Sequence, residues 1–551
     1  MPAVVRKARG YLRPKVRAVP RQARSFGRRA VALAEVSRAQ TYVERKDYAR
    51  AEQILSDLLK RYAGTKSALG LQSQVMVKQG RFDEAAVLSN RLAELSGKPE
   101  DRARARALMG RLVETDPGWL PYAGEPRPLT DPEPGRVLYL AKESMPYFHN
   151  GFCTRTHETL KSVQGAGLDP VAVTMPGFPA TVGRHAKTQV SRVEGIRYRH
   201  VLPYSATLQS LPYDEYLQLS AQVLTREVAA LRPELLHIGS GHRGYETALV
   251  GRALAAWSGL PWLYEVRSFF ETTWTDDERY MESGPYFHRR YGAETRSMQA
   301  ADMVVTLSGP MRDEIVSGHG VDPSRVVVIP NAVDLERFEP EERDAALRDR
   351  LGLTGKLVLG YISNLDHHRE AQEVLLEATA RLRARGLDAA VLLVGDGRRR
   401  PELEQRAADL GLGANAVFTG SVPFGKVAQY YSQIDLFVVP RINERAGRLV
   451  SPMKPFEAMA MNVPLVVSDL PALVEIAGAG ERAEVFRAGD PDSLAAVAER
   501  LLSSPEALAG MAERARAWVA VERTWAACGR AFADAYEQAK DNHARRATGG
   551  R

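Results

Sequence analysis

Short runs of aliphatic and β-branched residues recur along most of the chain, and each is followed by a stretch with helical patterning. The first series comprises residues 137–140, 170–174, 235–238, 262–266 and 303–307, and the second comprises 357–362, 390–394, 416–419, 436–439 and 465–468. Strands that are apolar throughout lie in parallel sheets covered by helices on both faces. We therefore expect an α/β fold with two doubly wound, Rossmann-like domains and a ligand cleft between the carboxyl ends of their sheets.

Residues 36–115 carry a different pattern, with helical periodicity and almost no strand signal. Within them an offset of 34 residues pairs Tyr48 with Phe82 and Ala51 with Ala85, so that large and small apolar positions both repeat. This period resembles tetratricopeptide repeats (TPR), which are helix pairs that bury one face by stacking on their neighbours. Two copies and a closing helix make a short array, which ordinary amphipathic hairpins could also produce.

Changes of pattern mark the limits of the domains. Six prolines between residues 116 and 135 cannot extend a helix and stiffen the chain, which is typical of a linker. The expected divisions are a basic leader at 1–35, a helical domain at 36–115, a Pro-rich linker at 116–135, Rossmann-like domains at 136–329 and 330–510, a long C-terminal helix at 511–540 and a tail at 541–551.

Basic charge is concentrated at the N-terminus. The net charge is +8, and residues 1–30 contain ten Lys or Arg and no Asp or Glu, which leaves 65 basic against 67 acidic residues elsewhere. Such a segment can lie on anionic lipid headgroups, where each charge contributes about 1 kcal/mol. We therefore expect an anionic membrane surface as a partner of residues 1–30, with a disordered tail as the alternative. We expect no nucleic-acid partner, because no basic patch accompanies this segment.

Cysteine content and hydropathy suggest a compartment. The two cysteines, Cys153 and Cys528, are too few for a disulfide scaffold or a cysteine-type metal site. No run of eighteen apolar residues could span a bilayer, and no apolar stretch follows the basic N-terminus as it would in a secretory signal. We expect a cytoplasmic protein that binds peripherally at the inner face of the plasma membrane.

The most informative segment for chemistry is 450–460, which follows the strand at 436–439 and its loop. Pro455 suits the first turn of a helix, where free backbone amides and Lys454 could hold an anion of diphosphate size. Glu457 lies about one turn further, where its carboxylate could accept hydrogen bonds from vicinal sugar hydroxyls. Its alternative role is only to complement the helix dipole.

The loop at 144–151, after the first strand, is a second candidate. It ends in Gly151, which permits close approach of the backbone to a ligand just before a helix begins. Many such loops use glycine for turn geometry alone.

In combination these segments resemble the glycosyltransferase family 4 enzymes of GT-B fold, which transfer a sugar from a nucleotide donor with retention. The segments that carry the resemblance are 451–460, 464–469 and 475–476, then 146–151 with 154–157, and also 328–334, 393–397 and 417–423. Their order and spacing agree with the family over roughly residues 136–537. In relatives the last helix crosses back to the first Rossmann-like domain.

The resemblance implies a set of donor-binding residues. It assigns the donor diphosphate to Gly151 with its neighbour Asn150, to Lys454, to Ser451 and to the amides near Met453. It places Glu457 on the ribose and the loop that contains Val422 beside the base. Fixed cations and amides would stabilise the departing diphosphate, so we expect no metal and no other cofactor.

Three positions depart from the family's pattern. Leu449 stands where many relatives have the first carboxylate of a Glu-x7-Glu pair, so Glu457 is alone. The stretch 361–371 lacks the usual Gly-Arg and later Lys-Gly, and Arg369 is the nearest cation there. Arg267 replaces a frequent histidine, and an arginine can neutralise phosphate or orient an acceptor but cannot act as a base at neutral pH.

The catalytic candidates are therefore Arg267, Lys454 and His242. His242 follows the strand at 235–238, where Glu271 and Arg243 also lie near strand ends, and each of these could instead be a solvated loop residue.

Together these expectations describe a retaining glycosyltransferase with a nucleotide-sugar donor and a glycan or lipid-linked acceptor, acting in cell-envelope glycan or glycolipid synthesis. A protein partner is expected at the helical repeats. One alternative is a non-catalytic GT-B scaffold in an envelope-polymer assembly complex, which the departures at Leu449 and Arg267 favour. Another is a nucleotide-sugar epimerase on the same fold.

Overall fold

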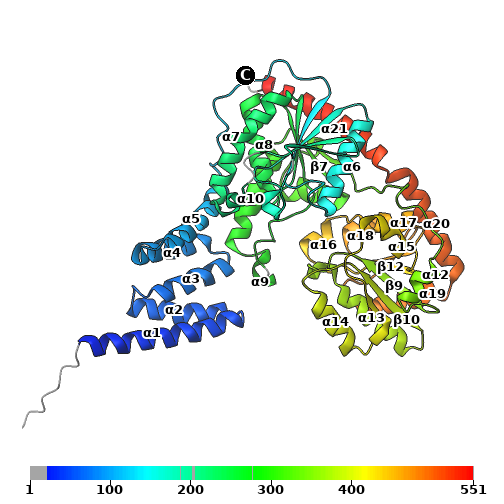
Figure 1. The fold of residues 1–551 in the computed structure, drawn as a ribbon, viewed down its shortest axis with the longest axis horizontal. Helices are drawn as coiled ribbons and strands as arrows, with labels where there is room; N and C mark the ends of the chain where they lie inside the picture. The colour runs from blue at the N-terminus through cyan, green and yellow to red at the C-terminus, as the bar shows by residue number, and fades with distance from the viewer. Residues whose placement is uncertain (1–20, 187, 202–204, 276, 550–551) are drawn as a thin grey trace, which may run out of the picture. The chain divides into compact units, whose positions relative to one another are not determined.

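The computed structural model describes residues 21–186, 188–201, 205–275 and 277–549. It divides into two compact units (Figure 1). The first unit ends at Leu112 and also includes Gly284–Tyr286, and the second contains Val113–Ser283 and Phe287–Arg551. Residues 1–20, which hold most of the expected basic leader, lie outside the described residues.

The first unit is built from helices that follow one another along the chain. They are α1 (Arg21–Glu44), α2 (Tyr48–Arg61), α3 (Lys66–Lys78), α4 (Phe82–Ser96) and α5 (Pro99–Glu114), the last of which continues into the second unit. Tyr48 and Phe82 begin α2 and α4 and are both buried, and Ala51 and Ala85 are both fully buried. The 34-residue offset therefore relates structurally equivalent positions, as stacking of repeated helix pairs requires.

The helical region begins earlier than expected. α1 starts at Arg21, inside the stretch that the sequence pattern assigns to a leader at 1–35. The reason is composition, because the residues after Pro20 are mostly Arg, Ala and Gln, which have high helix propensity. Basic charge alone therefore did not separate a leader from a helix.

The second unit contains two sheets, and the larger belongs to its N-terminal half. Its strands are β1 (Arg136–Ala141), β2 (Asp169–Thr174), β3 (Val190–Val193), β4 (Ile196–Arg199), β5 (Leu235–Gly239), β6 (Trp262–Glu265), β7 (Met303–Thr306) and β8 (Val326–Val328). Their order is β3-β4-β2-β1-β5-β6-β7-β8, and every pairing is parallel except the β3–β4 hairpin.

The smaller sheet belongs to the C-terminal half and is parallel throughout. Its strands are β9 (Leu357–Ile362), β10 (Ala389–Val394), β11 (Ala416–Phe418), β12 (Leu436–Val439), β13 (Leu465–Ser468) and β14 (Glu484–Phe486), in the order β11-β10-β9-β12-β13-β14. Both sheets confirm the predicted α/β fold with tandem Rossmann-like domains.

Helices cover both sheets. In the N-terminal half they are α6 (Gly151–Gly165), α7 (Tyr213–Leu231), α8 (Tyr245–Ser258), α9 (Glu278–Met281), α10 (Pro285–Ala300) and α11 (Gly309–Asp313). In the C-terminal half they are α12 (Ala345–Arg350), α13 (Gln372–Ala384), α14 (Arg400–Asp409), α15 (Val427–Tyr431), α16 (Arg445–Leu449), α17 (Lys454–Ala460), α18 (Pro471–Ala477), α19 (Pro491–Leu502), α20 (Pro505–Glu522) and α21 (Trp525–Gly549). No helix in the described ranges has both the length and the apolar character that a bilayer crossing needs.

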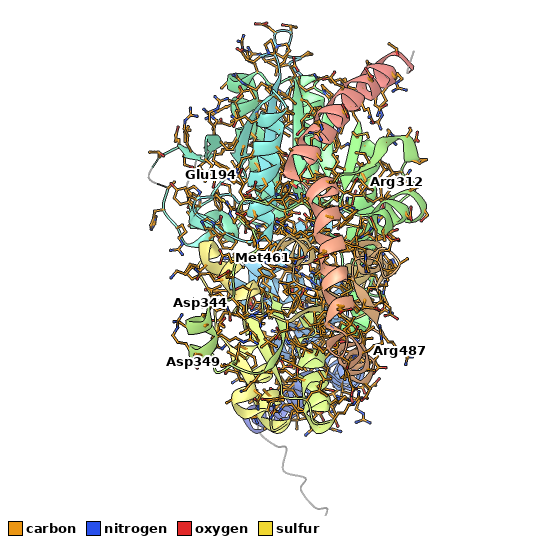
Figure 2. The ribbon with its side chains drawn as sticks, turned by 90° about the vertical axis from the view of Figure 1, so that its right-hand side faces the viewer. Glu194, Arg312, Asp344, Asp349, Met461 and Arg487 are labelled. Atoms are coloured by element: carbon orange, nitrogen blue, oxygen red, sulfur yellow. The ribbon has the colours of Figure 1, made fainter. Side chains whose placement is uncertain are left out.

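The C-terminal helix crosses back to the first sheet, as in the family that the sequence resembles. α21 packs against α6, β6 and β7, and its course beside the first sheet is visible in Figure 2. Phe532 and Tyr536 of α21 are buried in a cluster with residues of that sheet. It also runs past the expected end at residue 540, because Arg546 donates hydrogen bonds to the carbonyl oxygens of Ala300 and Ala301 at 2.8 and 2.9 Å. Those carbonyls lie at the C-terminal end of α10, where a cation is stabilising. Residues 541–549 therefore belong to the fold and not to a tail.

One buried carboxyl in α10 gives a testable pH dependence. Glu294 is 2% exposed, accepts a hydrogen bond from the Tyr264 hydroxyl at 2.7 Å, and its burial raises its pKa well above the ordinary range. An unfolded glutamate ionises near pH 4.3, so this group stabilises the fold at low pH and the contribution is lost as the pH rises, at up to about 1.4 kcal/mol per pH unit. The Glu294→Gln side chain cannot ionise. We therefore expect the melting temperature of this variant to rise relative to that of the native protein as the pH increases from 5 to 8. Glu513→Gln, at an exposed position, is the control. A melting-temperature difference between Glu294→Gln and the native protein that stays constant from pH 5 to pH 8 would contradict the assignment.

Candidate active site

The site lies where the two halves of the second unit meet, at the start of α6 and the start of α17. Asn150 caps α6, and its side-chain oxygen accepts a hydrogen bond from the Cys153 amide at 2.8 Å. Met453 is the residue that precedes α17, and a Cβ added to Gly151 would lie 3.4 Å from its Cε. The structure therefore brings Gly151 and Met453 together, although they are far apart in the sequence.

Lys454 and Glu457 form a pair within α17. The Lys454 ammonium lies 3.2 Å from Oε2 of Glu457, and the buried Tyr431 hydroxyl donates to the same oxygen at 2.8 Å. The Lys454 side chain is 31% exposed and that of Glu457 is 7% exposed, so the cation can reach a ligand while the carboxylate is fixed. Among the described residues Oε1 of Glu457 has no hydrogen-bond partner and can accept from a ligand hydroxyl.

Tyr431 gives a prediction of moderate size. Tyr431→Phe removes the hydrogen bond that orients Glu457, and a neutral-to-charged hydrogen bond contributes on the order of 1–2 kcal/mol. We expect the KM for the donor to rise roughly fivefold or more while kcat stays close to the native value, because a hydroxyl contact to Glu457 holds substrate and transition state alike. Tyr430→Phe, on the neighbouring half-buried tyrosine, should change neither constant. Equal effects of the two variants in steady-state kinetics would contradict this role.

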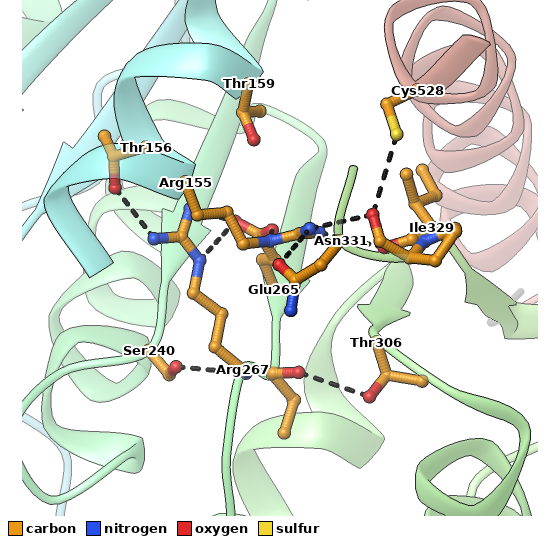
Figure 3. Close-up of polar contacts among 12 residues, drawn as sticks. Arg155, Thr156, Thr159, Ser240, Glu265, Arg267, Thr306, Ile329, Asn331 and Cys528 are labelled. Carbon is orange, nitrogen blue, oxygen red and sulfur yellow. Dashed lines mark hydrogen bonds and ion pairs between the residues drawn. The ribbon is translucent and has the colours of Figure 1, made fainter. Parts of the chain in front are cut away.

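Ser451 is held by the segment that connects the two halves. Its carbonyl oxygen accepts a hydrogen bond from the Asn331 amide at 2.8 Å. Arg155 of α6 binds the same segment through the Asn331 side chain at 3.1 Å and through the carbonyls of Pro330 and Ile329, both at 2.9 Å (Figure 3). The loop before α17 is thereby tied to α6 across the domain boundary.

Arg267 lies in the same buried network and not in a ligand-binding position. It is 4% exposed, and its guanidinium donates to Glu265 at 2.6 and 2.9 Å and to Thr156 Oγ1 at 2.7 Å (Figure 3). It also donates to the Phe152 carbonyl at 3.0 Å and to the Tyr139 hydroxyl. An arginine has five N–H donors, and these bonds use all of them. The expectation that Arg267 contacts substrate is corrected on this ground: it is a positioning residue at the base of α6.

Glu265 is the centre of this network. It is fully buried, and burial opposes its ionisation, but Arg267 and Arg155 outweigh that effect and hold its pKa well below the ordinary range. His237 lies beside it, with Nε2 3.3 Å from Glu265 Oε2 and Nδ1 2.8 Å from the Tyr536 hydroxyl of α21. His237 is thus a packed core histidine, as its place within an apolar strand predicts.

His242 lies on the N-terminal side of the site. Its Nε2 is 3.4 Å from Oε1 of the buried Glu143, whose other oxygen accepts from the Asn150 amide at 3.2 Å. Partial burial and the neighbouring Lys142 ammonium lower the pKa of His242. Glu143 connects this catalytic candidate to the cap of α6.

The C-terminal side holds an ion pair that the sequence analysis missed. The buried Arg441, just after β12, binds Glu370 at 2.9 and 3.2 Å and donates to the carbonyl of Val450 at 3.0 Å. Burial of Glu370 is outweighed by Arg441 and Arg369, which lower its pKa to about 2. In the sequence, Arg441 is marked as an arginine two residues after a buried strand. Arg267 has the same position relative to β6 in the N-terminal half.

Arg369 and Val422, which the sequence analysis assigned to donor binding, have other contacts in the structure. Arg369 is half-buried and contacts Glu370 at 3.3 Å, so it belongs to the Arg441 cluster. Val422 lies in the loop after β11 and packs against the hydrophobic core of the C-terminal half.

A second missed residue, Arg445 of α16, binds the N-terminal half directly. Its Nε lies 2.7 Å from Glu271 and its Nη2 lies 2.6 Å from Glu314. The guanidinium also lies over the rings of Phe269 and Tyr291, at 4.8 and 5.5 Å from their centroids. Glu271, which the sequence suggested as a substrate contact, is therefore engaged by Arg445.

Two backbone contacts extend this attachment. The Ser308 hydroxyl donates to the carbonyl of Leu449 at 2.7 Å, and the Gly309 amide donates to Glu475 at 2.9 Å. The loop that carries Ser451, Met453 and the start of α17 follows α16 directly. Its position therefore depends on contacts with the N-terminal half.

Two Rossmann-like domains that meet at the carboxyl ends of their sheets define the GT-B fold. Sucrose-phosphate synthase from Thermosynechococcus elongatus shares this fold with a TM-score of 0.59 at 19% identity, over 73% of this chain and 98% of that one. Residues 150–332 match the model of a glycosyl transferase 4-like domain, and residues 356–504 match that of glycosyl transferases group 1. The chain belongs to glycosyltransferase family 4.

Two curated relatives show how far the similarity extends. A GDP-mannose-dependent alpha-(1-6)-phosphatidylinositol monomannoside mannosyltransferase from Mycolicibacterium smegmatis is 30% identical over 42% of this chain and 62% of its own length. A D-inositol 3-phosphate glycosyltransferase from Geodermatophilus obscurus is 31% identical over 42% of this chain and 52% of its own length. The chain thus matches a little over half the length of these relatives.

Proposed function

We propose that the protein is a retaining glycosyltransferase that moves a sugar from a nucleotide-sugar donor to an acceptor hydroxyl. The observation that supports this most is the approach of Gly151 to Met453, which places Lys454 and Glu457 at the boundary between the two Rossmann-like domains. Family membership and the position at the carboxyl ends of two parallel sheets agree with it.

The chemistry follows from the charge that develops on the leaving group. A departing nucleoside diphosphate gains negative charge, which the Lys454 ammonium and the amides around Ser451 and Met453 would stabilise. A donor phosphate oxygen would take the acceptor proton on the face from which the diphosphate leaves. Because these groups are fixed in the protein, we propose that no metal is required, and that EDTA leaves the rate unchanged.

The acceptor is proposed to be a glycan or a lipid-linked glycan of the cell envelope. The relatives named above act on inositol-containing acceptors, and one of them uses GDP-mannose. A panel of UDP-, GDP- and ADP-sugars, first in thermal shift and then in turnover with candidate acceptors, tests the proposal, because a ligand that binds the native state stabilises it. Transfer with retention supports it. Donor conversion without acceptor would indicate an epimerase, and binding of no donor would indicate a scaffold.

We further propose that the basic N-terminal segment binds the inner face of the plasma membrane. Deletion of residues 1–20 removes six of the ten cations and leaves α1 intact, which begins at Arg21. At about 1 kcal/mol per charge, we expect co-sedimentation with phosphatidylglycerol vesicles to fall more than tenfold, with no change on neutral vesicles. Unchanged co-sedimentation would overturn it. The helical unit is proposed to bind a protein partner and not nucleic acid.

A further inference from the structure

A pocket in the N-terminal half of the second unit is lined by none of the residues proposed to bind the donor. It has a volume of about 120 Å³ and lies beyond the carboxyl ends of β1, β2 and β5. Its lining includes the apolar and aromatic side chains of Met175, Phe178, Tyr213 and Tyr216, and the charged or polar side chains of Lys142, His242 and Glu246. Pockets with an aromatic wall and a few polar groups bind small ligands in one orientation.

The aromatic wall is held in place before any ligand arrives. The Tyr216 hydroxyl donates to the carbonyl of Pro176 at 3.0 Å, and the guanidinium of Arg243 lies over the Tyr213 ring, 3.6 Å from its centroid. A preformed wall lowers the entropic cost of binding, and a flat ring offers its apolar face to such a wall.

Lys142 is the unusual group in this pocket. Its ammonium lies 4.2 Å from the ring centroid of Phe152 and 5.5 Å from that of Phe270, and among the described residues it makes no hydrogen bond and no ion pair. The Lys142 side chain is half-buried, and this burial lowers its pKa. An ammonium that is partly removed from water and has no hydrogen-bond acceptor is stabilised when an anion binds beside it.

Glu143 and Glu246 attract the Lys142 ammonium and partly offset the effect of burial on its pKa, but neither forms an ion pair with it in the described part of the chain. Both oxygens of Glu246 accept from the Arg243 amide at 2.9 Å. Glu143 is shared between the Asn150 amide at 3.2 Å and His242 at 3.4 Å.

The pocket adjoins the proposed donor site. Phe152, which lies under the Lys142 ammonium, directly follows Gly151, and Gly151 faces Met453. His242 joins the pocket to the cap of α6 through Glu143 and Asn150. A ring in this pocket would therefore lie beside the sugar of the donor, on the side of the N-terminal half.

We propose that this pocket binds the acceptor sugar, and that this sugar carries an anionic group, a carboxylate or a phosphate, which pairs with the Lys142 ammonium. The inference rests on the proposed transfer reaction and names the acceptor class for it. The ring stacks on Phe178, Tyr213 and Tyr216, and the anion fills the acceptor position that Lys142 lacks.

Direct binding of simple sugars to the full-length protein tests the proposal without any transfer. The probes are methyl glucuronide, methyl galacturonide, glucose 6-phosphate and inositol 1-phosphate, each compared with its neutral counterpart by calorimetry. We expect at least one anionic probe to bind ten times or more tightly than its neutral counterpart. Lys142→Met should reduce that preference to within twofold, and Lys142→Arg should keep part of it. The control is Lys356→Met, which lies at the amino end of β9 in the C-terminal half. This variant should bind the probes like the native protein.

The outcomes separate this proposal from the proposed function. Equal binding of charged and neutral probes, a preference that survives in Lys142→Met, or binding of no probe would overturn the pocket assignment. The rate of donor hydrolysis without acceptor should be within twofold of the native rate in Lys142→Met. Loss of this hydrolysis in the variant would show that the ammonium contacts the donor, and would also overturn the assignment. A native protein that binds the anionic probes but turns over no donor would instead contradict the proposed function and leave the pocket standing.

Discussion

Lys454→Met is expected to lower kcat/KM for sugar transfer by roughly 10²- to 10³-fold, which is the cost of removing one fixed group that stabilises developing charge. Methionine keeps most of the length and the apolar part of the side chain. Lys454 is 31% exposed and pairs only with Glu457 among the described residues, so stability should change by no more than about 0.5 kcal/mol. Steady-state kinetics with the cognate donor measure the loss, and thermal unfolding shows that the fold is intact.

The matched control for this variant is Lys356→Met. Lys356 lies at the amino end of β9, whereas the proposed donor site lies at the carboxyl ends of the strands. Both changes remove one positive charge, so a general effect of net charge would appear in both. A Lys454→Met enzyme with kcat/KM within fivefold of native would remove Lys454 from the proposed mechanism.

Arg445→Met is expected to lower kcat/KM by about 10- to 100-fold through a different route. Arg445 touches no part of the proposed donor, but it binds Glu271 and Glu314 at 2.7 and 2.6 Å and holds α16 against the N-terminal half. Breaking a buried ion pair by removing one partner costs about 3–5 kcal/mol, because the other charge stays buried and unpaired. Here that cost should favour separation of the two halves, visible as a larger radius of gyration in solution scattering.

The loss of kcat/KM in Arg445→Met should depend on pH and should be larger at high pH. Burial raises the pKa of Glu271 even with Arg445 present, and loss of the guanidinium should raise it further. Below that higher pKa the carboxyl is neutral and no unpaired charge is buried, so the defect should be smaller at pH 5.5 than at pH 8. Arg448→Met, on the same helix and 35% exposed, should behave like the native protein. Native kcat/KM in Arg445→Met at both pH values would show that the contact is not needed for activity.

The fold was predictable wherever a strand is buried on both faces. The ten apolar runs in the sequence correspond to β1, β2, β5, β6 and β7 in one sheet and to β9 to β13 in the other. The missed strands are β3, β4, β8 and β14, which are only three or four residues long. Polar or charged residues interrupt the apolar pattern in β3, β4 and β14, whereas β8 consists of three valines and is short.

The site was predictable where one short segment supplies it. Lys454 and Glu457 are three residues apart on one helix, and Gly151 is the first residue of another, so local patterns indicate both. Arg445 and Glu271 are 174 residues apart, and their pairing depends on how two domains meet. Arg267 shows the reverse case: its place after β6 was correct, but only the structure shows that Glu265, Thr156 and the neighbouring groups already occupy its donors.

The most direct test of the central claim is a calorimetric comparison of a nucleoside diphosphate with its parent nucleoside, using the base of the cognate donor. If Lys454 and the amides around Met453 bind the diphosphate opposite Gly151, the native protein should bind the diphosphate about 100-fold or more tightly than the nucleoside, and Lys454→Met should narrow that gap at least tenfold. Equal affinity of the native protein for the two ligands, or a gap that Lys454→Met leaves unchanged, would contradict the account.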